Sequence, residues 1–118
     1  MSTLVLPGLL AEQSGDMRGA LTAYAHAADV NPWNVSVQSR LGAVYLALGN
    51  PSEARRAFER VVQLDRSNVE AQIDLAQLLL AHGERAAAMK RIEEALAFEP
   101  ASQRALAMRD AISRPLAR

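Results

Sequence analysis

The sequence predicts an all-α fold built from helical hairpins, and three features of the chain support this prediction. Ala makes up about a fifth of the 118 residues, and Ala has the highest helix propensity of all residues. Only 4% of the residues are aromatic, and β-branched runs are few, so a sheet has little to build with. The third feature is a repeat of 34 residues that runs along the chain and indicates where helices begin and end.

The repeat becomes visible when the chain is numbered from residue 1 and wrapped every 34 residues. Position 8 is small and position 24 is large, so the two helices of one hairpin are expected to pack closely. Position 15 suits the left-handed turn after a helix, and position 20 is always Ala. The residues at positions 8, 15, 20 and 24 are Gly8, Gly42 and Ala76; Gly15, Gly49 and Gly83; Ala20, Ala54 and Ala88; and Tyr24, Phe58 and Ile92.

Helix boundaries follow from prolines and capping residues. The first helix is expected to begin near Leu6 or to be kinked, because Pro7 has no backbone N–H to donate. The hairpins that follow, and a last helix over 103–113, each open at a residue that suits an N-cap. These N-caps are Asn34, Asn68 and Ser102.

The second repeat gives the clearest hairpin. Apolar residues recur at spacings of three and four over 35–48 and again over 51–64, as expected for two amphipathic helices. Asn50 is expected to cap the second of these helices. Tyr45 and Phe58 are expected to lie in the core.

The stretch LGAVYLALGNPSEARRAF, residues 41–58, carries the spacing L-G-x2-Y followed by A-x3-F. This pattern resembles the tetratricopeptide repeat (TPR) family, and the resemblance covers residues 1–102. It implies a right-handed α-solenoid of three hairpins, with six helices and a seventh, capping helix over 103–113. We therefore expect a single TPR domain over 1–118, with repeats at 1–34, 35–68 and 69–102.

The chain departs from the family pattern at two positions. Gln38 and Gln72 stand at position 4, where the signature has Trp, and we interpret this position as one that decides little. Arg66 replaces the Pro expected at position 32, so the turn that follows the second repeat is expected to be less stiff.

In this family the first helix of each hairpin, the A helix, lines a concave groove, and the second is the B helix. The resemblance implies a peptide-binding groove made by Val5, Leu9, Ser39, Arg40, Ala43, Leu46, Ile73, Asp74, Gln77, Leu80, Arg104 and Met108. Ile73 and Leu80 lie outside the core stripe of their helix, so they form either an apolar strip for a partner or a contact with the neighbouring helix. Arg40 and Asp74 occupy the same position of adjacent repeats and are expected to face each other.

One subset of the family grips the C-terminal carboxylate of heat-shock chaperones with Lys, Asn and Arg side chains. The corresponding positions hold Val5, Leu9, Arg40, Glu70 and Asp74. Only Arg40 could help to bind a carboxylate, while Glu70 and Asp74 would repel one. We therefore exclude the chaperone C-terminal motif as the partner.

The sequence gives little support for a catalytic, metal-binding, nucleic-acid-binding or membrane-binding function. The chain has no Cys, and His26 and His82 are isolated, so we expect no metal, no cofactor and no catalytic residue. Thirteen basic and thirteen acidic residues balance, which gives no reason to expect a nucleic-acid or membrane partner. Arg55, Arg56 and Arg60 are interpreted as a solvated helix face paired with its own Glu residues, and Trp33 as a buried plug of its turn.

The leading hypothesis is a non-catalytic protein-interaction module that binds a peptide or a helical segment. Two alternatives stay open. One is a homodimer or larger assembly through an apolar N-terminal edge of Leu4, Leu6 and Leu10, and the other is a regulatory appendage of an enzyme. A cytoplasmic location is expected, with the periplasm open, and the use of Arg for twelve of the thirteen basic residues indicates a bacterial source.

Overall fold

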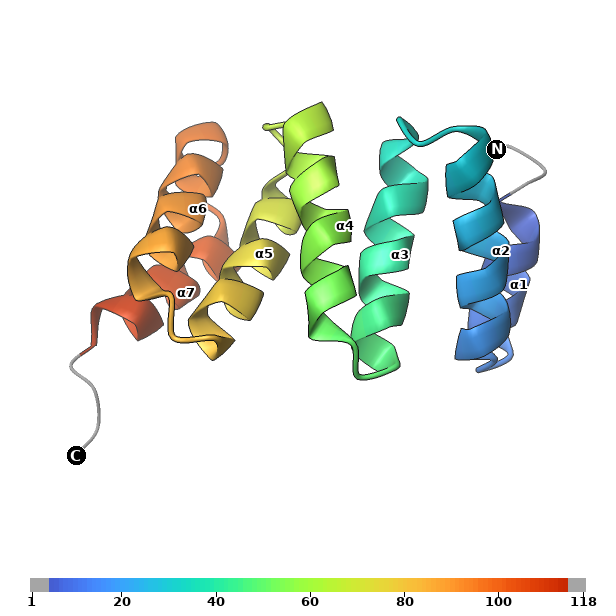
Figure 1. Ribbon diagram of the computed structural model, residues 1–118. Helices are drawn as coiled ribbons and strands as arrows, with labels where there is room; N and C mark the ends of the chain where they lie inside the picture. Colours follow the sequence, from blue (N-terminus) through green and yellow to red (C-terminus); the bar gives the residue numbers. More distant parts are fainter. Residues whose placement is uncertain (1–4, 115–118) are drawn as a thin grey trace. The chain divides into compact units, whose positions relative to one another are not determined.

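The computed structural model describes residues 5–114, and in this range all regular structure is α-helical (Figure 1). The helices are α1 (Leu6–Gln13), α2 (Met17–Val30), α3 (Val35–Ala47), α4 (Pro51–Leu64), α5 (Val69–Ala81), α6 (Arg85–Phe98) and α7 (Gln103–Ser113). They form two compact units that divide between Leu64 and Asp65. The first unit holds α1 to α4, and the second holds α5 to α7. None of the helices in the described range is long and apolar enough to cross a lipid bilayer.

The predicted helix boundaries are confirmed. The first helix begins at Leu6 with Pro7 in its first turn, where a missing N–H costs no helical hydrogen bond. In the second repeat, α3 ends one residue before the predicted 48 and α4 spans the predicted range. Gly15, Gly49 and Gly83 have φ angles of 81°, 75° and 81°, which lie in the left-handed region that lets the chain turn after an A helix.

The predicted N-caps are also confirmed, and they explain why each helix starts where it does. The Asn34 and Asn68 side chains accept hydrogen bonds from the backbone N–H groups of Val37 and Ala71, at 3.2 and 3.1 Å. Ser102 accepts from the N–H of Ala105 at 3.2 Å. Each bond satisfies an N–H group that has no partner inside its own helix.

Each hairpin of the first unit closes where a glycine of the A helix meets a ring of the B helix. A β-carbon added to Gly42 would lie 2.6 Å from two ring atoms of Phe58, and one added to Gly8 would lie 2.4 Å from the Tyr24 ring. Tyr24 and Phe58 are buried, so neither ring can move aside into solvent. In the second unit the same two positions hold Ala76 and Ile92, and both are fully buried. The methyl group of Ala76 therefore fits at this position, where the residue of the B helix is Ile92 and not an aromatic residue.

Tyr24 forms the centre of the first unit's core and also carries a polar link to the third helix. Its ring packs with buried apolar residues that include Val37 and Leu41 of α3. Its hydroxyl donates a hydrogen bond to Glu12 at 2.7 Å, and Arg40 donates to the same carboxylate oxygen at 3.1 Å. Burial, together with the neighbouring Glu12 carboxylate, raises the pKa of Tyr24 from 10.0 to about 12. Tyr45, which was expected in the core, is only half-buried beside it.

Gln38 and Gln72 do more than the sequence interpretation allowed, since both are buried and both tie down the turn before their helix. The Gln38 amide donates to the carbonyl of Pro32 at 3.2 Å, and the Gln72 amide donates to the carbonyl of Arg66 at 3.3 Å. Each bond therefore links an A helix to position 32 of the preceding repeat. The view that position 4 decides little is wrong here, because a long amide side chain reaches this carbonyl.

We expect Gly42→Ala to lower the free energy of unfolding by about 1–3 kcal/mol, because its methyl group would overlap the buried Phe58 ring. The double variant Gly42→Ala with Phe58→Ile copies the Ala76 and Ile92 pair and should recover part of this loss. Urea unfolding followed by circular dichroism measures both effects. A Gly42→Ala protein at least as stable as wild type would contradict the packing described here, because helix propensity alone favours Ala.

We expect the stability of the fold to decrease as the pH rises from 10.0 towards about 12, because Tyr24 keeps its proton in the folded chain while the unfolded chain loses it. Below pH 10.0 both states hold this proton, and the contribution is fully present. A Tyr45→Phe variant leaves Tyr24 as the only tyrosine, so its ionisation can be followed by ultraviolet absorbance. A Tyr24 midpoint near 10 in the folded protein would contradict both the burial of this hydroxyl and its hydrogen bond to Glu12.

Candidate functional site

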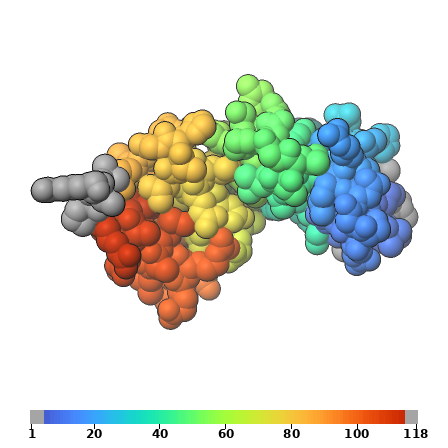
Figure 2. Space-filling view, turned by 90° about the horizontal axis from the view of Figure 1, so that it is seen from below, coloured from blue at the N-terminus to red at the C-terminus, as the bar shows by residue number. Residues whose placement is uncertain are grey.

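The A helix of the third repeat and the last helix enclose a hollow of about 290 Å³ in the second unit. We call it the α5–α7 hollow. Its lining consists of side chains at spacings of three and four on both helices, so each helix presents one face to it. The lining residues are Ile73 and Gln77 of α5 and Arg104, Ala107, Met108 and Ala111 of α7. Figure 2 shows the atoms of α7, in red, on the face seen from below.

A cluster of three charged side chains lies at one end of the α5–α7 hollow. Arg104 donates to Asp74 at 3.1 Å and also pairs with Glu70. Glu70 and Arg104 keep 66% and 47% of their side chains exposed, while Asp74 keeps 30%. Two carboxylates therefore share one guanidinium, and this end of the hollow carries a net negative charge.

The protonation of this cluster reflects its partial burial. Burial raises the pKa of Asp74 above its usual value, and the hydrogen bond from Arg104 offsets part of this effect. Burial acts to lower the pKa of Arg104, but the hydrogen bond to Asp74 and the charge of Glu70 outweigh it and raise that pKa. Arg104 thus stays cationic and holds the two acidic side chains of α5 against the start of α7.

In the first unit the predicted groove residues lie on α1 and α3 and offer a mixed surface. Ala43 is exposed and Leu46 keeps 41% of its surface exposed. Leu9 and Ser39 are half-buried. Arg40 pairs with Glu12 at 3.1 Å, and this pair links α3 to α1.

Arg40 and Asp74 were expected to face each other, and this stays a prediction, because the two residues belong to different units. Each is paired inside its own unit, Arg40 with Glu12 and Asp74 with Arg104. The physical reason is that a carboxylate or a guanidinium lies within hydrogen-bonding distance on the neighbouring A-type helix of the same unit. The two charges therefore hold helices together within each unit.

Two residues predicted to offer apolar surface are in fact buried. Val5 precedes the first turn of α1 and is 4% exposed, because it packs into the core around Tyr24 and Val37. Ile73 is 1% exposed because α7 packs against α5, so it forms the floor of the α5–α7 hollow. Leu80 is half-buried and does not line this hollow, whereas Gln77, Arg104 and Met108 do.

The predicted N-terminal edge retains apolar surface. Leu6 and Leu10 lie one turn apart on α1, and 49% and 57% of their surfaces are exposed. Leu4, the third residue predicted for this edge, lies outside the described residues.

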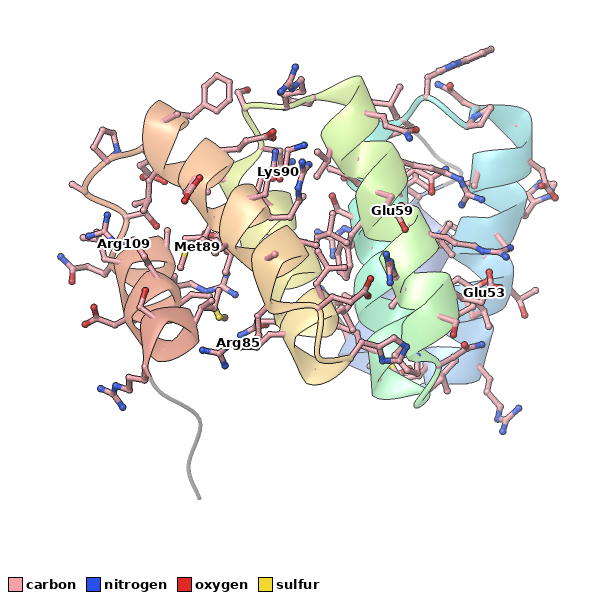
Figure 3. All side chains as sticks on the ribbon, turned by 60° about the vertical axis from the view of Figure 1, so that its left-hand side comes forward. Glu53, Glu59, Arg85, Met89, Lys90 and Arg109 are labelled. Carbon is pink, nitrogen blue, oxygen red and sulfur yellow. The ribbon has the colours of Figure 1, made fainter. Side chains whose placement is uncertain are left out.

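Charges on α4 are paired largely within the helix, as the sequence predicted. Arg55 pairs with Glu59 at 3.3 Å and Arg56 approaches Glu53 at 3.8 Å. Figure 3 shows Glu53 and Glu59 projecting from this helix. Within residues 5–114, Arg60 has no ion pair or hydrogen bond, so the prediction is wrong for this one residue.

Sequence reasoning did not identify Arg85, which fastens the end of the last helix. This residue opens α6, and its guanidinium donates to the backbone carbonyls of Ile112 and, at 2.9 Å, of Arg114 (Figure 3). It thereby satisfies carbonyls that have no partner within α7. No local signal marks this role, because the two partners lie 27 and 29 residues along the chain.

Across residues 5–114, no group of three or more His, Cys, Asp or Glu side chains is arranged to hold a metal ion. The α5–α7 hollow instead combines an apolar floor with a charged end. Such a surface suits a side chain of a binding partner.

Comparison with known proteins agrees with this architecture. The family model for the tetratricopeptide repeat matches residues 11–62 and 49–112. Human tetratricopeptide repeat protein 7A is 33% identical over 101 residues, which are 86% of this chain and 12% of that protein, so the chain spans only a small part of this relative.

Two solved structures extend the likeness to the fold. The crystal structure of MamA has a TM-score of 0.85 at 26% identity, with 95% of this chain and 63% of that chain covered. The first TPR of Spaghetti (RPAP3), bound to the HSP90 peptide SRMEEVD, has a TM-score of 0.82 at 24% identity, with 93% and 89% covered. With the repeat pattern, the helical hairpins and the family match in agreement, the chain belongs to the tetratricopeptide repeat family.

Proposed function

We propose that the protein is a non-catalytic interaction module that binds a peptide or a helical segment of another protein along its A-helix surfaces. The observation that carries this proposal is the α5–α7 hollow, which lies at the positions where the family resemblance implies a groove. Its volume of about 290 Å³ is at the lower end of ligand pockets, which hold about 300–1,000 Å³. It therefore suits one or two side chains of a peptide better than a whole small molecule.

The lining indicates which side chains fit. Ile73, Ala107 and Met108 make the hollow largely apolar, and Met adapts its shape to different partners. The net negative end formed by Glu70, Asp74 and Arg104 favours a basic residue beside the apolar one. The bound segment would thus carry an apolar side chain flanked by Lys or Arg.

The same charges argue against a free C-terminal carboxylate as the ligand. Among the described residues that line the α5–α7 hollow, Arg104 carries the only guanidinium, and this group is already shared by two carboxylates. In the first unit, Arg40 is paired with Glu12. The HSP90 peptide bound by the Spaghetti domain has the sequence SRMEEVD, which is rich in acidic residues, and we propose a different class of peptide for this chain.

Residues Leu6 and Leu10 favour a second candidate function, which is self-association through α1. Two large apolar side chains, each about half exposed, lie on one short helix and form a surface that a second copy could cover. Self-association through Leu6 and Leu10 is independent of peptide binding at the α5–α7 hollow, because none of the residues that line this hollow lies on α1.

We expect peptides selected from a random displayed library on the full chain to bind wild type and to lose about tenfold or more in affinity with Ala107→Arg. Ala107 is exposed and lines the hollow, so the long arginine side chain would fill it without disturbing the core. Ala97→Arg is the matched control, because Ala97 is exposed on α6 and does not line the hollow. Fluorescence anisotropy measures the affinities. Equal binding to wild type and Ala107→Arg would move the site elsewhere, and the parallel variant Ala43→Arg would then test the first unit.

We expect wild-type protein to form a dimer at micromolar concentrations and Leu10→Glu to weaken this dimer about tenfold, because a carboxylate would have to be buried in the contact. Leu46→Glu removes a comparably exposed leucine from α3 and serves as the control. Sedimentation equilibrium gives the dissociation constants. A strictly monomeric wild-type protein at high concentration would eliminate self-association and leave the peptide proposal intact.

A further inference from the structure

A second hollow, of about 230 Å³, lies in the first unit, between the α2–α3 loop and the last turns of α4. We call it the Trp33 hollow. It is lined by Pro32, Trp33, Arg60, Gln63 and Leu64. Trp33 is 72% exposed, so the expectation of a buried turn plug is wrong. Leu64 is 39% exposed, which leaves two large apolar side chains accessible beside one arginine.

The loop that carries Trp33 is held by its own hydrogen bonds. The Asn31 side chain accepts from the N–H of Trp33 at 3.2 Å, and the Gln38 side chain holds the carbonyl of Pro32. Asn31 also accepts, through its carbonyl, from the N–H of Asn34 at 3.3 Å. The indole is therefore displayed from a fixed backbone, which lowers the entropy lost when a partner covers it.

The junction between the second and third repeats shows what occupies the equivalent place there. Position 32 of the second repeat is Arg66 and position 26 of the third is Glu94, and the two form an ion pair at 3.3 Å. The Glu94 carboxylate also accepts from Gln72 at 3.1 Å and from Arg91 at 3.2 Å. One carboxylate thus satisfies three donors at this junction.

The junction between the first and second repeats lacks that carboxylate. At the positions of Arg66, Arg91 and Glu94 it has Pro32, Ala57 and Arg60. Arg60 has no charged or hydrogen-bonded partner within residues 5–114. The Gln38 Oε1 atom, equivalent to the oxygen of Gln72 that accepts from Arg91, is buried without a partner in the described part of the chain. The junction therefore presents a free cation next to an exposed indole.

We propose that the Trp33 hollow is a second docking site, distinct from the A-helix surfaces, for a peptide segment in which a large apolar residue stands beside an acidic one. The apolar side chain packs against Trp33 and Leu64, and the carboxylate pairs with Arg60. Charge complementarity selects the acidic residue, because the hollow offers an unpaired guanidinium and no carboxylate among its lining residues. The volume accommodates one side chain, so the segment binds in an extended form through a short motif.

Trp33 is the only tryptophan of the chain, so its fluorescence reports directly on this hollow. The probe is a capped peptide, Gly-Ser-Glu-Leu-Glu-Ser-Gly, titrated into the full-length protein at low salt. We expect a saturable blue shift of the emission as the leucine covers the indole. The affinity should fall about tenfold in Arg60→Glu, and it should weaken as salt is added. The double variant Pro32→Arg with Arg60→Glu copies the ion pair between Arg66 and Glu94 and should abolish the shift.

Two matched controls separate this site from general charge effects. Arg18→Glu makes the same charge change on an exposed residue of α2 outside the hollow, and it should bind within about twofold of wild type. A peptide with Gln in place of both Glu residues should bind about tenfold more weakly. Thermal unfolding of each variant confirms that the fold is retained.

Three results would overturn the proposal. The first is the absence of any saturable shift with the acidic peptide, and the second is equal binding of the Gln peptide or of Arg60→Glu. The third is a shift that depends on protein concentration alone, with sedimentation showing a dimer, because a second copy would then occupy the hollow. None of these results bears on the α5–α7 hollow, which is tested separately by Ala107→Arg.

Discussion

In the first unit each A helix has a glycine at position 8, and the missing side chain determines how closely the two helices of a hairpin approach each other. At Gly8 and Gly42 the ring of a buried aromatic residue occupies the space where a β-carbon would stand. Such a contact lets a large ring lie directly on the helix backbone. In packing this dense, a larger side chain on the helix and a smaller side chain in place of the ring would both destabilise the fold. The position of Tyr24 follows from it, and with Tyr24 come the polar contacts that reach Glu12 and Arg40.

Hydrogen bonds from two buried amide side chains also hold the structure together, because each joins an A helix to the turn before it. Gln38 and Gln72 make the same contact to a backbone carbonyl, but their surroundings differ. The Gln72 amide donates to Glu94 and accepts from Arg91, whereas the Gln38 Oε1 has no hydrogen-bond partner within residues 5–114. A buried polar atom without a partner costs free energy, so the two junctions contribute unequally to stability although their backbones follow the same pattern.

Nearly all of the helix boundaries could be predicted from the sequence, because the signals are local. Gly49 has to turn left-handed whatever surrounds it, and Asn34 caps the residues that follow it directly. The site was less predictable, because burial depends on distant segments. Ile73 is buried by α7, a helix that begins 30 residues later in the chain. Arg40 pairs with Glu12, which lies 28 residues earlier, and sequence spacing does not distinguish this carboxylate from other acidic residues. Trp33 illustrates the same limit, since nothing in its neighbours indicates which way a turn residue faces.

The way in which α7 is fastened has a consequence for hydrogen exchange. This helix has 11 residues, a length at which an isolated helix is marginal in water. Arg104 joins its first turn to α5, and Arg85 of α6 holds the carbonyls at its other end. Two arginines thus contact this helix at its opposite ends, in addition to the apolar packing of its buried residues Ala105 and Ile112. Local opening of α7 would expose Ile73 and remove one wall of the α5–α7 hollow, so amide protection along this helix reports the fraction of time in which the hollow is formed.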